Sequence, residues 1–252
     1  MIIYRQRCVR VAEVWFDSGL APDSDVDVVS IRRSLRPING HHNIASQTLV
    51  SDLTMSVDLL LNVMSGTNRY EIRRAEKTDN LSYKVLISPS LEDYKSFVSF
   101  YNAFASNKGL SVISNHGHKI NLSYIQNRNI ILTCVLKAGN PLVWHSYFVY
   151  GNRCRPIYSA SHYRYTNDTQ MRSLIGRANR WLHWQDMLKF KEIELCNYDW
   201  GGWHTGNDSV LLKINKFKES FGGVQTTVYD ARYGITLLGR LENAALQAFH
   251  KL

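Results

Sequence analysis

The stretch IILTCVLKAGNPLVWHSYFVYGNRCRPIYSASHY, residues 130–163, contains three apolar runs rich in β-branched and aromatic side chains. Short turn sequences separate the runs, Ala-Gly-Asn at 138–140 and Gly-Asn at 151–152. Runs of this composition, interrupted by turn residues, are typical of consecutive antiparallel strands. The stretch therefore predicts a three-stranded meander and, with it, a β-sheet in the second half of the chain.

The residues after the meander alternate between helical and extended patterns. A long helix is expected from about Asp168 to Phe190, with Asp168 as its N-cap. ELCNYD (194–199) predicts a short strand that ends just before Gly201-Gly202, and we expect the meander to lie beside this strand in a mixed sheet. LLKINKFKES (211–220) predicts a helix, VQTTVYD (224–230) a strand and LENAALQAFHKL (241–252) a terminal helix.

The first half shows two early strands and two helices. Alternating apolar residues around positions 9–11 and 26–28 predict the strands. NRYEIRRAEK (68–77) predicts a short cationic helix, and LEDYKSFVSFYNAFASNKGL (91–110) an amphipathic helix that stops at Gly109. The order of these elements predicts an α+β fold with a mixed central sheet flanked by helices.

The composition is that of a folded protein with a basic surface. Of 252 residues, 44% are hydrophobic and 20% are charged, and the formal net charge is +9. Such a surplus favours polyanionic partners such as RNA or phosphorylated cofactors, although a basic surface that binds nothing has the same composition. The sequence contains no apolar run long enough for a signal peptide or a membrane span, so we expect a cytoplasmic protein.

Several chemistries are disfavoured by missing motifs. The four cysteines are scattered and have no histidine at metal-ligand spacing, so no metal site is expected. The sequence also lacks HExxH, GxSxG, P-loop and dinucleotide-binding motifs. These absences disfavour metalloproteases, α/β-hydrolases, nucleotide hydrolases and Rossmann dehydrogenases.

Four segments resemble the Fem family of aminoacyl-tRNA-dependent transferases, which build peptidoglycan side bridges, and related GNAT-fold N-acyltransferases. The segments are NRYEIRRAEK (68–77), YNAFASNKGL (101–110), NYDWGGW (197–203) and INKFKESFGG (214–223). The resemblance implies a GNAT-like mixed β-sheet flanked by helices and two GNAT-like halves. The first, at residues 1–127, would be reduced and the second would occupy residues 128–252, because the chain is shorter than typical Fem proteins.

The resemblance also indicates catalytic candidates. Phe217 and Lys218 fall where the family places an active-site Phe-Lys pair. A lysine ammonium can stabilise a developing oxyanion or hold an anionic carrier. Asp199, at the expected strand end, could accept the proton of an attacking amine, or it could simply bind backbone N–H groups of the following turn.

Other polar residues are candidates for binding the substrate. Trp203 and His204 follow the expected strand and could line the site. Asn179, His183 and Asp186 recur at i, i+4 and i+7 on the expected long helix and form a polar line along it. Asn179 and His183 are therefore substrate-binding candidates, although a solvated helix face gives the same pattern.

Anion-binding candidates come from three helical segments. CoA-dependent GNAT enzymes cradle pyrophosphate with a Gln/Arg-x-x-Gly-x-Gly/Ala loop at a helix N-terminus. Residues 173–178 match it in part, with Gly176 and Ala178 at the right spacing but Ser173 in place of the first residue, so Gly176 and the adjacent Arg177 are candidates. Gly176 could instead allow close helix packing. The other anion-binding candidates are the basic residues Arg73, Arg74 and Lys77 of the segment at 68–77 and Lys216 of the segment at 214–223.

We therefore expect an N-acyltransferase that moves an aminoacyl or acyl group to a primary amine of a cell-envelope or metabolite precursor. The donor would be aminoacyl-tRNA or acyl-CoA, bound as a co-substrate and not as a permanent cofactor. One alternative is a CoA-dependent N-acyltransferase acting on an amino sugar of a surface polysaccharide. Another is a non-catalytic RNA-binding module that keeps the scaffold, since fold alone does not imply activity.

Overall fold

The computed structural model describes residues 1–16, 25–164 and 166–249 and divides into two compact units. The smaller unit combines the first 48 residues with those from Gln225 onward, and the larger unit is Leu49–Val224. The predicted domain boundary at residue 127 falls inside the larger unit and matches neither of the two points where the chain passes between the units. Strand β5 (Leu81–Leu86), which precedes residue 127, pairs with β6 (Ile130–Lys137), which follows it. Both sides of residue 127 therefore belong to one sheet of the larger unit.

The smaller unit contains the two strands expected near the N-terminus. They are β2 and β3, and they pair in parallel with Val11 opposite Val28. Strand β1 pairs antiparallel with β2, and β10 pairs antiparallel with β3. The bounds are Ile2–Gln6 for β1, Val9–Trp15 for β2, Val28–Ser34 for β3, Asn43–Asp52 for β4, Val224–Gly234 for β10 and Leu237–Phe249 for helix α7.

The larger unit is built on the predicted meander. Strands β5, β6, β7 and β8 pair antiparallel in that order, and β9 pairs in parallel with β8. The sheet is mixed, and the strand expected at 194–199 lies beside the meander as predicted. The remaining strands are β7 (Asn140–Tyr150), β8 (Arg153–Ser161) and β9 (Asn197–Trp203).

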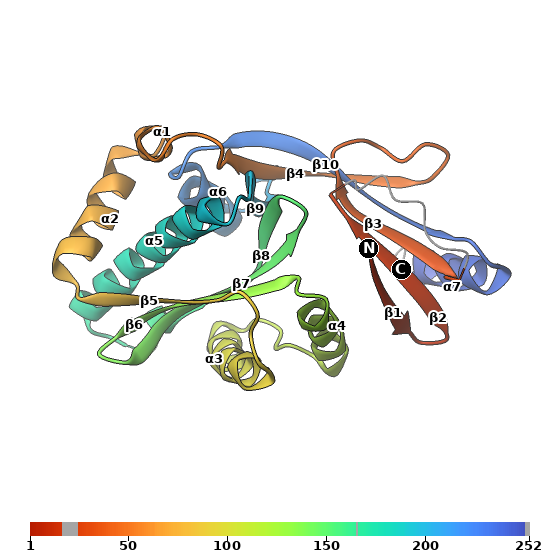
Figure 1. Ribbon diagram of the computed structural model, residues 1–252, viewed down its shortest axis with the longest axis horizontal. Helices are drawn as coiled ribbons and strands as arrows, with labels where there is room; N and C mark the ends of the chain where they lie inside the picture. The colour runs from red at the N-terminus through yellow and green to blue at the C-terminus, as the bar shows by residue number, and fades with distance from the viewer. Residues whose placement is uncertain (17–24, 165, 250–252) are drawn as a thin grey trace. The chain divides into compact units, whose positions relative to one another are not determined.

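Helices cover both faces of this sheet (Figure 1). Helices α2 and α5 lie on one face, whereas α3 and α4 lie on the other. Helix α5 begins after the predicted N-cap Asp168, whose side chain accepts a hydrogen bond from the Gln170 N–H. The helices are α1 (Val57–Asn62), α2 (Gly66–Thr78), α3 (Leu91–Lys108), α4 (Asn115–Gln126), α5 (Thr169–Glu192) and α6 (Ser209–Glu219), with a short 3-10 turn at His162–Arg164.

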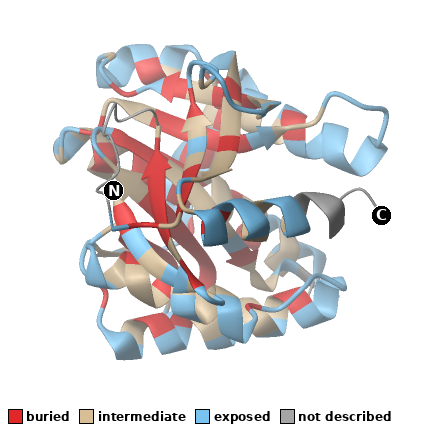
Figure 2. Cartoon of the chain, turned by 90° about the vertical axis from the view of Figure 1, so that its right-hand side faces the viewer, coloured by how far each residue is buried: buried red, intermediate tan, exposed pale blue. Residues whose placement is uncertain are grey.

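The core of the larger unit lies between α5 and the meander. Buried residues follow the central strands, while the helices turn exposed faces to solvent (Figure 2). Leu182, Met187 and Phe190 of α5 are fully buried against this sheet. Burial of each such side chain stabilises the fold by roughly 1.5 to 3 kcal/mol, so α5 is held firmly over the strands. In the part of the chain that the structure describes, no helix has the length and apolar character needed to cross a membrane.

Candidate active site

The parallel strands β8 and β9 stay paired over a short distance only. Their register joins Arg153 to Asn197 and Cys154 to Tyr198, and the described strands then diverge. Pro156 lies two residues after Cys154 on β8, and it cannot donate a backbone hydrogen bond to a neighbouring strand. The register of β8 against β7 also shifts beside Pro156, as expected of a β-bulge that redirects a strand. The sequence of β8 therefore favours an opening in the sheet.

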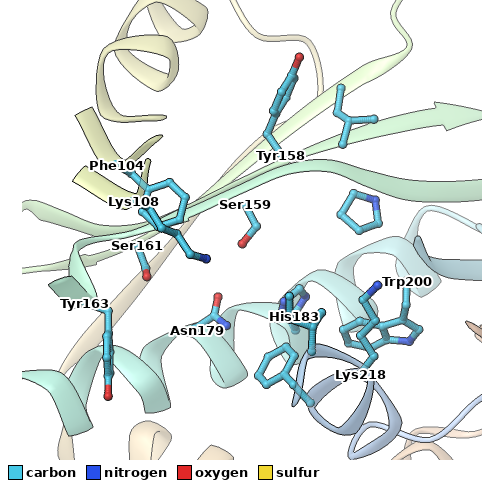
Figure 3. A pocket seen from close by; sticks show the side chains of 14 residues that line it. Phe104, Lys108, Tyr158, Ser159, Ser161, Tyr163, Asn179, His183, Trp200 and Lys218 are labelled. Atoms are coloured by element: carbon cyan, nitrogen blue, oxygen red, sulfur yellow. The ribbon is translucent and has the colours of Figure 1, made fainter. Parts of the chain in front are cut away.

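A pocket of about 530 Å³ occupies this opening (Figure 3). Consecutive residues of β8, from Pro156 to Ser159, line it, although neighbouring side chains of a strand point to opposite faces. The edge of β8 itself must therefore border the pocket. The volume of the pocket lies within the range of roughly 300 to 1,000 Å³ that is usual for small-molecule sites. The other walls include Trp200 of β9, Asn179 and His183 of α5, and Phe217 and Lys218 of α6.

Lys218 lies at one end of the pocket, the end that it shares with His183 and Trp200 (Figure 3). Its ammonium group donates a hydrogen bond to the carbonyl oxygen of Gly202, at 2.5 Å. Burial lowers the pKa of Lys218 to about 8, Arg155 adds to this effect and Asp199 opposes it. Lys218 is therefore mainly charged at neutral pH and only partly hydrated, so a developing negative charge in the pocket would interact with it strongly.

Phe217 lines the same wall as Lys218. Its ring centroid lies 5.7 Å from that of His183 and 5.4 Å from that of Phe221. The guanidinium of Arg180 lies 5.0 Å from the Phe217 ring centroid, in a cation–π contact. The structure thus brings Phe217 and Lys218 to the pocket, together with Asn179 and His183.

Asp199 has a different position from the one expected. Strand β9 does not end before the two glycines but continues through them to Trp203, so Asp199 lies inside the strand. Gly201 permits this with a φ of +79°, a value that favours glycine. The fully buried carboxylate of Asp199 accepts hydrogen bonds from Arg153 at 2.8 Å, Arg155 at 3.3 Å and the Gly201 N–H at 2.9 Å. It serves here as the anchor of two arginines.

Trp203 and His204 lie outside this pocket. Trp203 is partly buried against the hydrophobic core. Nε2 of His204 accepts a hydrogen bond from the backbone N–H of Asp208, and the His204 backbone is held by the side chain of Asn215. Both residues shape the segment between β9 and α6.

A chain of short hydrogen bonds links His183 to the buried carboxylate of Asp186. The Tyr147 hydroxyl donates to Asp186 at 2.6 Å, and the Tyr198 hydroxyl lies 2.6 Å from that of Tyr147. Because the single proton of Tyr147 is used, its oxygen accepts from Tyr198. The proton of Tyr198 is then used as well, so its oxygen accepts from Nδ1–H of His183, at 2.7 Å. The proton of neutral His183 therefore lies on Nδ1, and the lone pair lies on Nε2.

Asp186 is surrounded by further donors. The hydroxyls of Tyr83 and Thr133 each donate to its carboxylate at 3.1 Å, and Nδ1 of His145 lies 2.9 Å from it. The other ring nitrogen of His145 lies 3.1 Å from the side-chain oxygen of Asn179. Both ring nitrogens of His145 therefore lie within hydrogen-bond distance of a side-chain oxygen.

The Tyr147 hydroxyl occupies the space among His145, His183 and Asp186. These three groups lie close enough to surround an ion, with their nearest ligand atoms within 4.8 Å of one another. The hydroxyl oxygen lies 2.6 Å from Oδ2 of Asp186, 3.0 Å from Nδ1 of His145 and 3.5 Å from Nδ1 of His183, within hydrogen-bond distance of all three groups. The arrangement is that of a hydrogen-bonded relay.

The protein environment keeps His183, Tyr198 and Tyr147 neutral; with Asp186 these residues form the relay. Burial lowers the pKa of His183 well below its usual value, and the nearby charges of His145, Arg180 and Lys218 lower it further. Burial and the negative charge of Asp186 raise the pKa values of Tyr147 and Tyr198 well above 10. At neutral pH His183 is therefore a neutral imidazole and Tyr147 and Tyr198 are phenols.

The predicted anion-binding residues are distributed over several surfaces. Arg73, Arg74 and Lys77 are exposed on α2, and Lys216 is exposed on α6. Arg177, by contrast, is buried and binds both oxygens of Asp79, at 2.7 and 2.9 Å, which ties α5 to the end of α2.

Gly176 lies well inside α5 and does not form a phosphate-binding loop. A Cβ atom at this position would meet no atom within 4 Å. The alternative explanation, that the glycine allows close helix packing, is therefore also wrong.

His145, Tyr147 and Tyr198 were not among the site residues predicted from the sequence. The sequence does contain a pattern that could have indicated His145 and Tyr147. They lie two residues apart on a largely apolar strand, so their side chains share one face of it. The polar line Asn179, His183 and Asp186 is the corresponding pattern on α5. Two polar stripes on apolar elements that pack together must satisfy each other.

Comparisons with known proteins show which fold this is. No protein-family model matches the chain, and no curated protein matches it in sequence. Among solved structures, FemX matches with 15% identity and a TM-score of 0.59, over 73% of this chain and 61% of the FemX chain. This chain therefore spans less than two thirds of FemX.

Two further structures match more of their own length. The C-terminal domain (DUF2156) of a proposed lysylphosphatidylglycerol synthetase from Agrobacterium fabrum has 12% identity and a TM-score of 0.57, over 98% of this chain and 82% of that one. L-PGS from Bacillus licheniformis has 11% identity and a TM-score of 0.53, over 81% and 67%. Similarity at this level of identity is a similarity of fold. The chain has the Fem-like, GNAT-type fold that its sequence predicts.

Proposed function

We propose that this protein is an N-acyltransferase that transfers an aminoacyl or acyl group from an activated carrier to a primary amine. The observation that carries the proposal is the pocket between β8 and β9, with Lys218 at one end. Polar groups of the bound acyl or aminoacyl moiety can hydrogen-bond to the open edge of β8. The fold shared with FemX and L-PGS supports acyl transfer in general, without deciding the acceptor.

The proposed reaction is a direct attack of the amine on the donor. The amine nitrogen bonds to the carbonyl carbon of an ester or thioester, and the carbonyl oxygen becomes an oxyanion that the Lys218 ammonium can stabilise. Collapse of this intermediate breaks the C–O or C–S bond and leaves an amide. The Cys154 thiol at the strand junction is buried, and its pKa is raised well above 9, so it is a poor nucleophile for a covalent route.

Two observations favour aminoacyl-tRNA over acyl-CoA as the donor. The carboxylate of Asp168 caps the N-terminus of α5 and places a negative charge where a pyrophosphate would need free N–H groups. The partial CoA-loop match around Gly176 lies in the helix interior. The net charge of +9 and the exposed cations of α2 are compatible with an RNA carrier, but they suit the phosphates of CoA as well.

The test is an amide-forming assay with both donor classes. The protein is incubated with bulk tRNA charged with radiolabelled amino acids or with acetyl-CoA, and with glucosamine or a lysine-containing peptide as the amine. We expect an alkali-stable amide, identified by mass spectrometry, from charged tRNA. Salt-sensitive binding of tRNA without any amide product would contradict the proposal and support a non-catalytic RNA-binding module.

A further inference from the structure

The hydrogen-bonded chain from Asp186 to His183 has one closed end and one open end. At the closed end, the carboxylate is completely buried and accepts hydrogen bonds from the surrounding hydroxyl groups and from His145. At the open end, His183 lines the pocket. Every hydroxyl between the two ends donates toward Asp186, so the chain has a single direction.

Nε2 of His183 is the open end. Among the hydrogen bonds of the described residues none involves this atom, and it is not among the buried polar atoms without a partner, so it retains contact with the pocket space. Figure 3 places His183 between Asn179 and Lys218 on the pocket wall. A lone pair on Nε2 is therefore available to a bound molecule.

We infer that His183 is the general base of the transfer reaction, and that Tyr198, Tyr147 and Asp186 are positioning residues that hold it in its Nδ1–H tautomer. The inference rests on the proposed function for its reaction, whereas the relay itself is a property of the fold. As the amine nitrogen bonds to the carbonyl carbon, its proton moves to Nε2 of His183. The same proton then passes to the leaving oxygen or sulfur as the C–O or C–S bond breaks, so the products are an amide and an alcohol or thiol.

The charges around His183 explain why a relay is useful. His145 faces it from β7 with a ring centroid distance of 4.1 Å, Arg180 is on its own helix, and Lys218 lies on α6. After burial, charge interactions with these three groups lower the pKa of His183 further. Tyr147 and Tyr198 are the uncharged groups in contact with it, and Asp186 is the negative charge to which they lead. When His183 takes a proton, each hydroxyl can shift its own proton toward Asp186 and spread the new charge.

The first test measures the relay without any substrate. Long-range ¹H–¹⁵N NMR spectra of the ¹⁵N-labelled full chain report the tautomer of each histidine, and His183→Asn assigns the signal. We expect neutral His183 with the proton on Nδ1 at pH 7. In Tyr198→Phe the acceptor is lost, so the Nδ1–H form should no longer dominate. Tyr94→Phe is the matched control, because it removes a buried tyrosine hydroxyl that contacts Nδ1 of another histidine, His118.

The second test measures amide formation in the assay described above. His183→Asn keeps a donor near the Nδ1 position and removes Nε2, and it should slow transfer by roughly a hundredfold to ten-thousandfold at saturating donor. Tyr198→Phe should slow it by roughly tenfold or more and move the acidic limb of the pH profile to lower pH, because His183 loses its link to Asp186. The variants His118→Asn and Tyr94→Phe should leave rate and profile unchanged.

The outcomes separate the relay from the reaction. An Nε2–H tautomer or a charged His183 at pH 7 would overturn the relay whatever the activity. A His183→Asn variant that keeps its rate and its acidic limb would overturn the general-base role. If the wild-type protein forms no amide with either donor, the proposed function fails and the catalytic role fails with it, while the NMR result still decides whether the relay exists.

Discussion

Asp199 and Asp186 are equally buried carboxylates of the larger unit, but their charges are balanced in opposite ways. Asp199 is balanced by two guanidinium groups, those of Arg153 and Arg155, which keep their charge at any working pH. Asp186 receives hydrogen bonds from three hydroxyl groups and lies against His145, and one hydroxyl continues into a chain that reaches the pocket. The first arrangement fixes a structure, whereas the second can respond to a proton.

The difference shows why strand position alone is a poor guide to a catalytic acid or base. Asp199 precedes a glycine pair, as a catalytic residue often would, but its neighbours leave no proton-accepting role for it. Asp186 lies mid-helix, yet its neighbours transmit its charge to His183. What a buried carboxylate does depends on whether its partners can move protons.

The largest expected effect is on stability at these two carboxylates. Asp199→Asn removes the buried carboxylate that the guanidinium groups of Arg153 and Arg155 share, and it should lower the free energy of unfolding by about 3 to 5 kcal/mol. Asp186→Asn should cost less, about 1 to 3 kcal/mol, because most donors to Asp186 are uncharged. Urea denaturation followed by tryptophan fluorescence measures both. Glu192→Gln, at an exposed ion pair with Lys189, is the control with an expected loss below about 1 kcal/mol. Equal losses at the two carboxylates would remove the distinction.

The next largest effect is expected on turnover in the Lys218→Ala variant. If Lys218 stabilises the oxyanion, turnover should fall by roughly tenfold to a thousandfold, or about 1.4 to 4 kcal/mol, with little change in donor binding. If it holds carrier phosphates instead, the donor KM should rise and Lys218→Arg should restore much of the affinity. Lys213→Ala, an exposed lysine on the same helix, is the control. Unaltered kinetics in Lys218→Ala would exclude the residue from the mechanism.

The pH dependence of the free energy of unfolding should show whether His183 is buried in its neutral form. Its pKa is lowered in the folded protein, so the unfolded chain binds its proton more readily. The resulting stability is complete above the unfolded pKa of about 6.5 and decreases as pH falls through the folded pKa, by at most about 1.4 kcal/mol per pH unit. Urea unfolding between pH 7.5 and 5 should therefore show a steeper decline for wild type than for His183→Asn. Parallel curves would mean that His183 is not buried in its neutral form.

The smallest effect concerns the exposed cations of α2. Reversal of Arg73, Arg74 and Lys77 to glutamate should weaken tRNA binding and reduce the slope of log affinity against log salt by about 0.7 to 0.9 for each phosphate that these side chains no longer neutralise. Filter binding over a salt series measures this slope. Reversal of Lys95 and Lys119, which are exposed on α3 and α4, is the control, since those helices cover the other face of the sheet. An unchanged slope after the α2 reversal would exclude this surface.

The sequence predicted the elements that have strong periodicity and clear ends. The meander, α3 with its stop at Gly109, α5 with its cap at Asp168, and α6 were all predicted, because apolar spacing and caps are local signals. Helix α4 and strand β5 were not predicted, since their apolar patterns are short and weak.

The candidate site was only partly predictable, because contacts across the sheet decide it. Phe217, Lys218, Asn179 and His183 line the pocket. The partners of Asp199 lie more than 40 residues away in sequence and reach it through the register of β8 against β9, which no local pattern encodes. The relay likewise joins β7, α5 and β9, three elements that meet only in the folded chain.

The separation of β8 from β9 gives the sheet an edge in its interior. Open edges at the rim of a sheet invite pairing with other molecules, and proteins protect them with charges, prolines or short strands. The β8 edge borders the pocket and is flanked by helices α3, α5 and α6, so a second copy of the protein cannot align a strand along it. It can remain unpaired without promoting aggregation. A small extended ligand can reach this edge through the pocket. The size of the pocket therefore restricts which molecules can bind to the edge, before any contact with side chains.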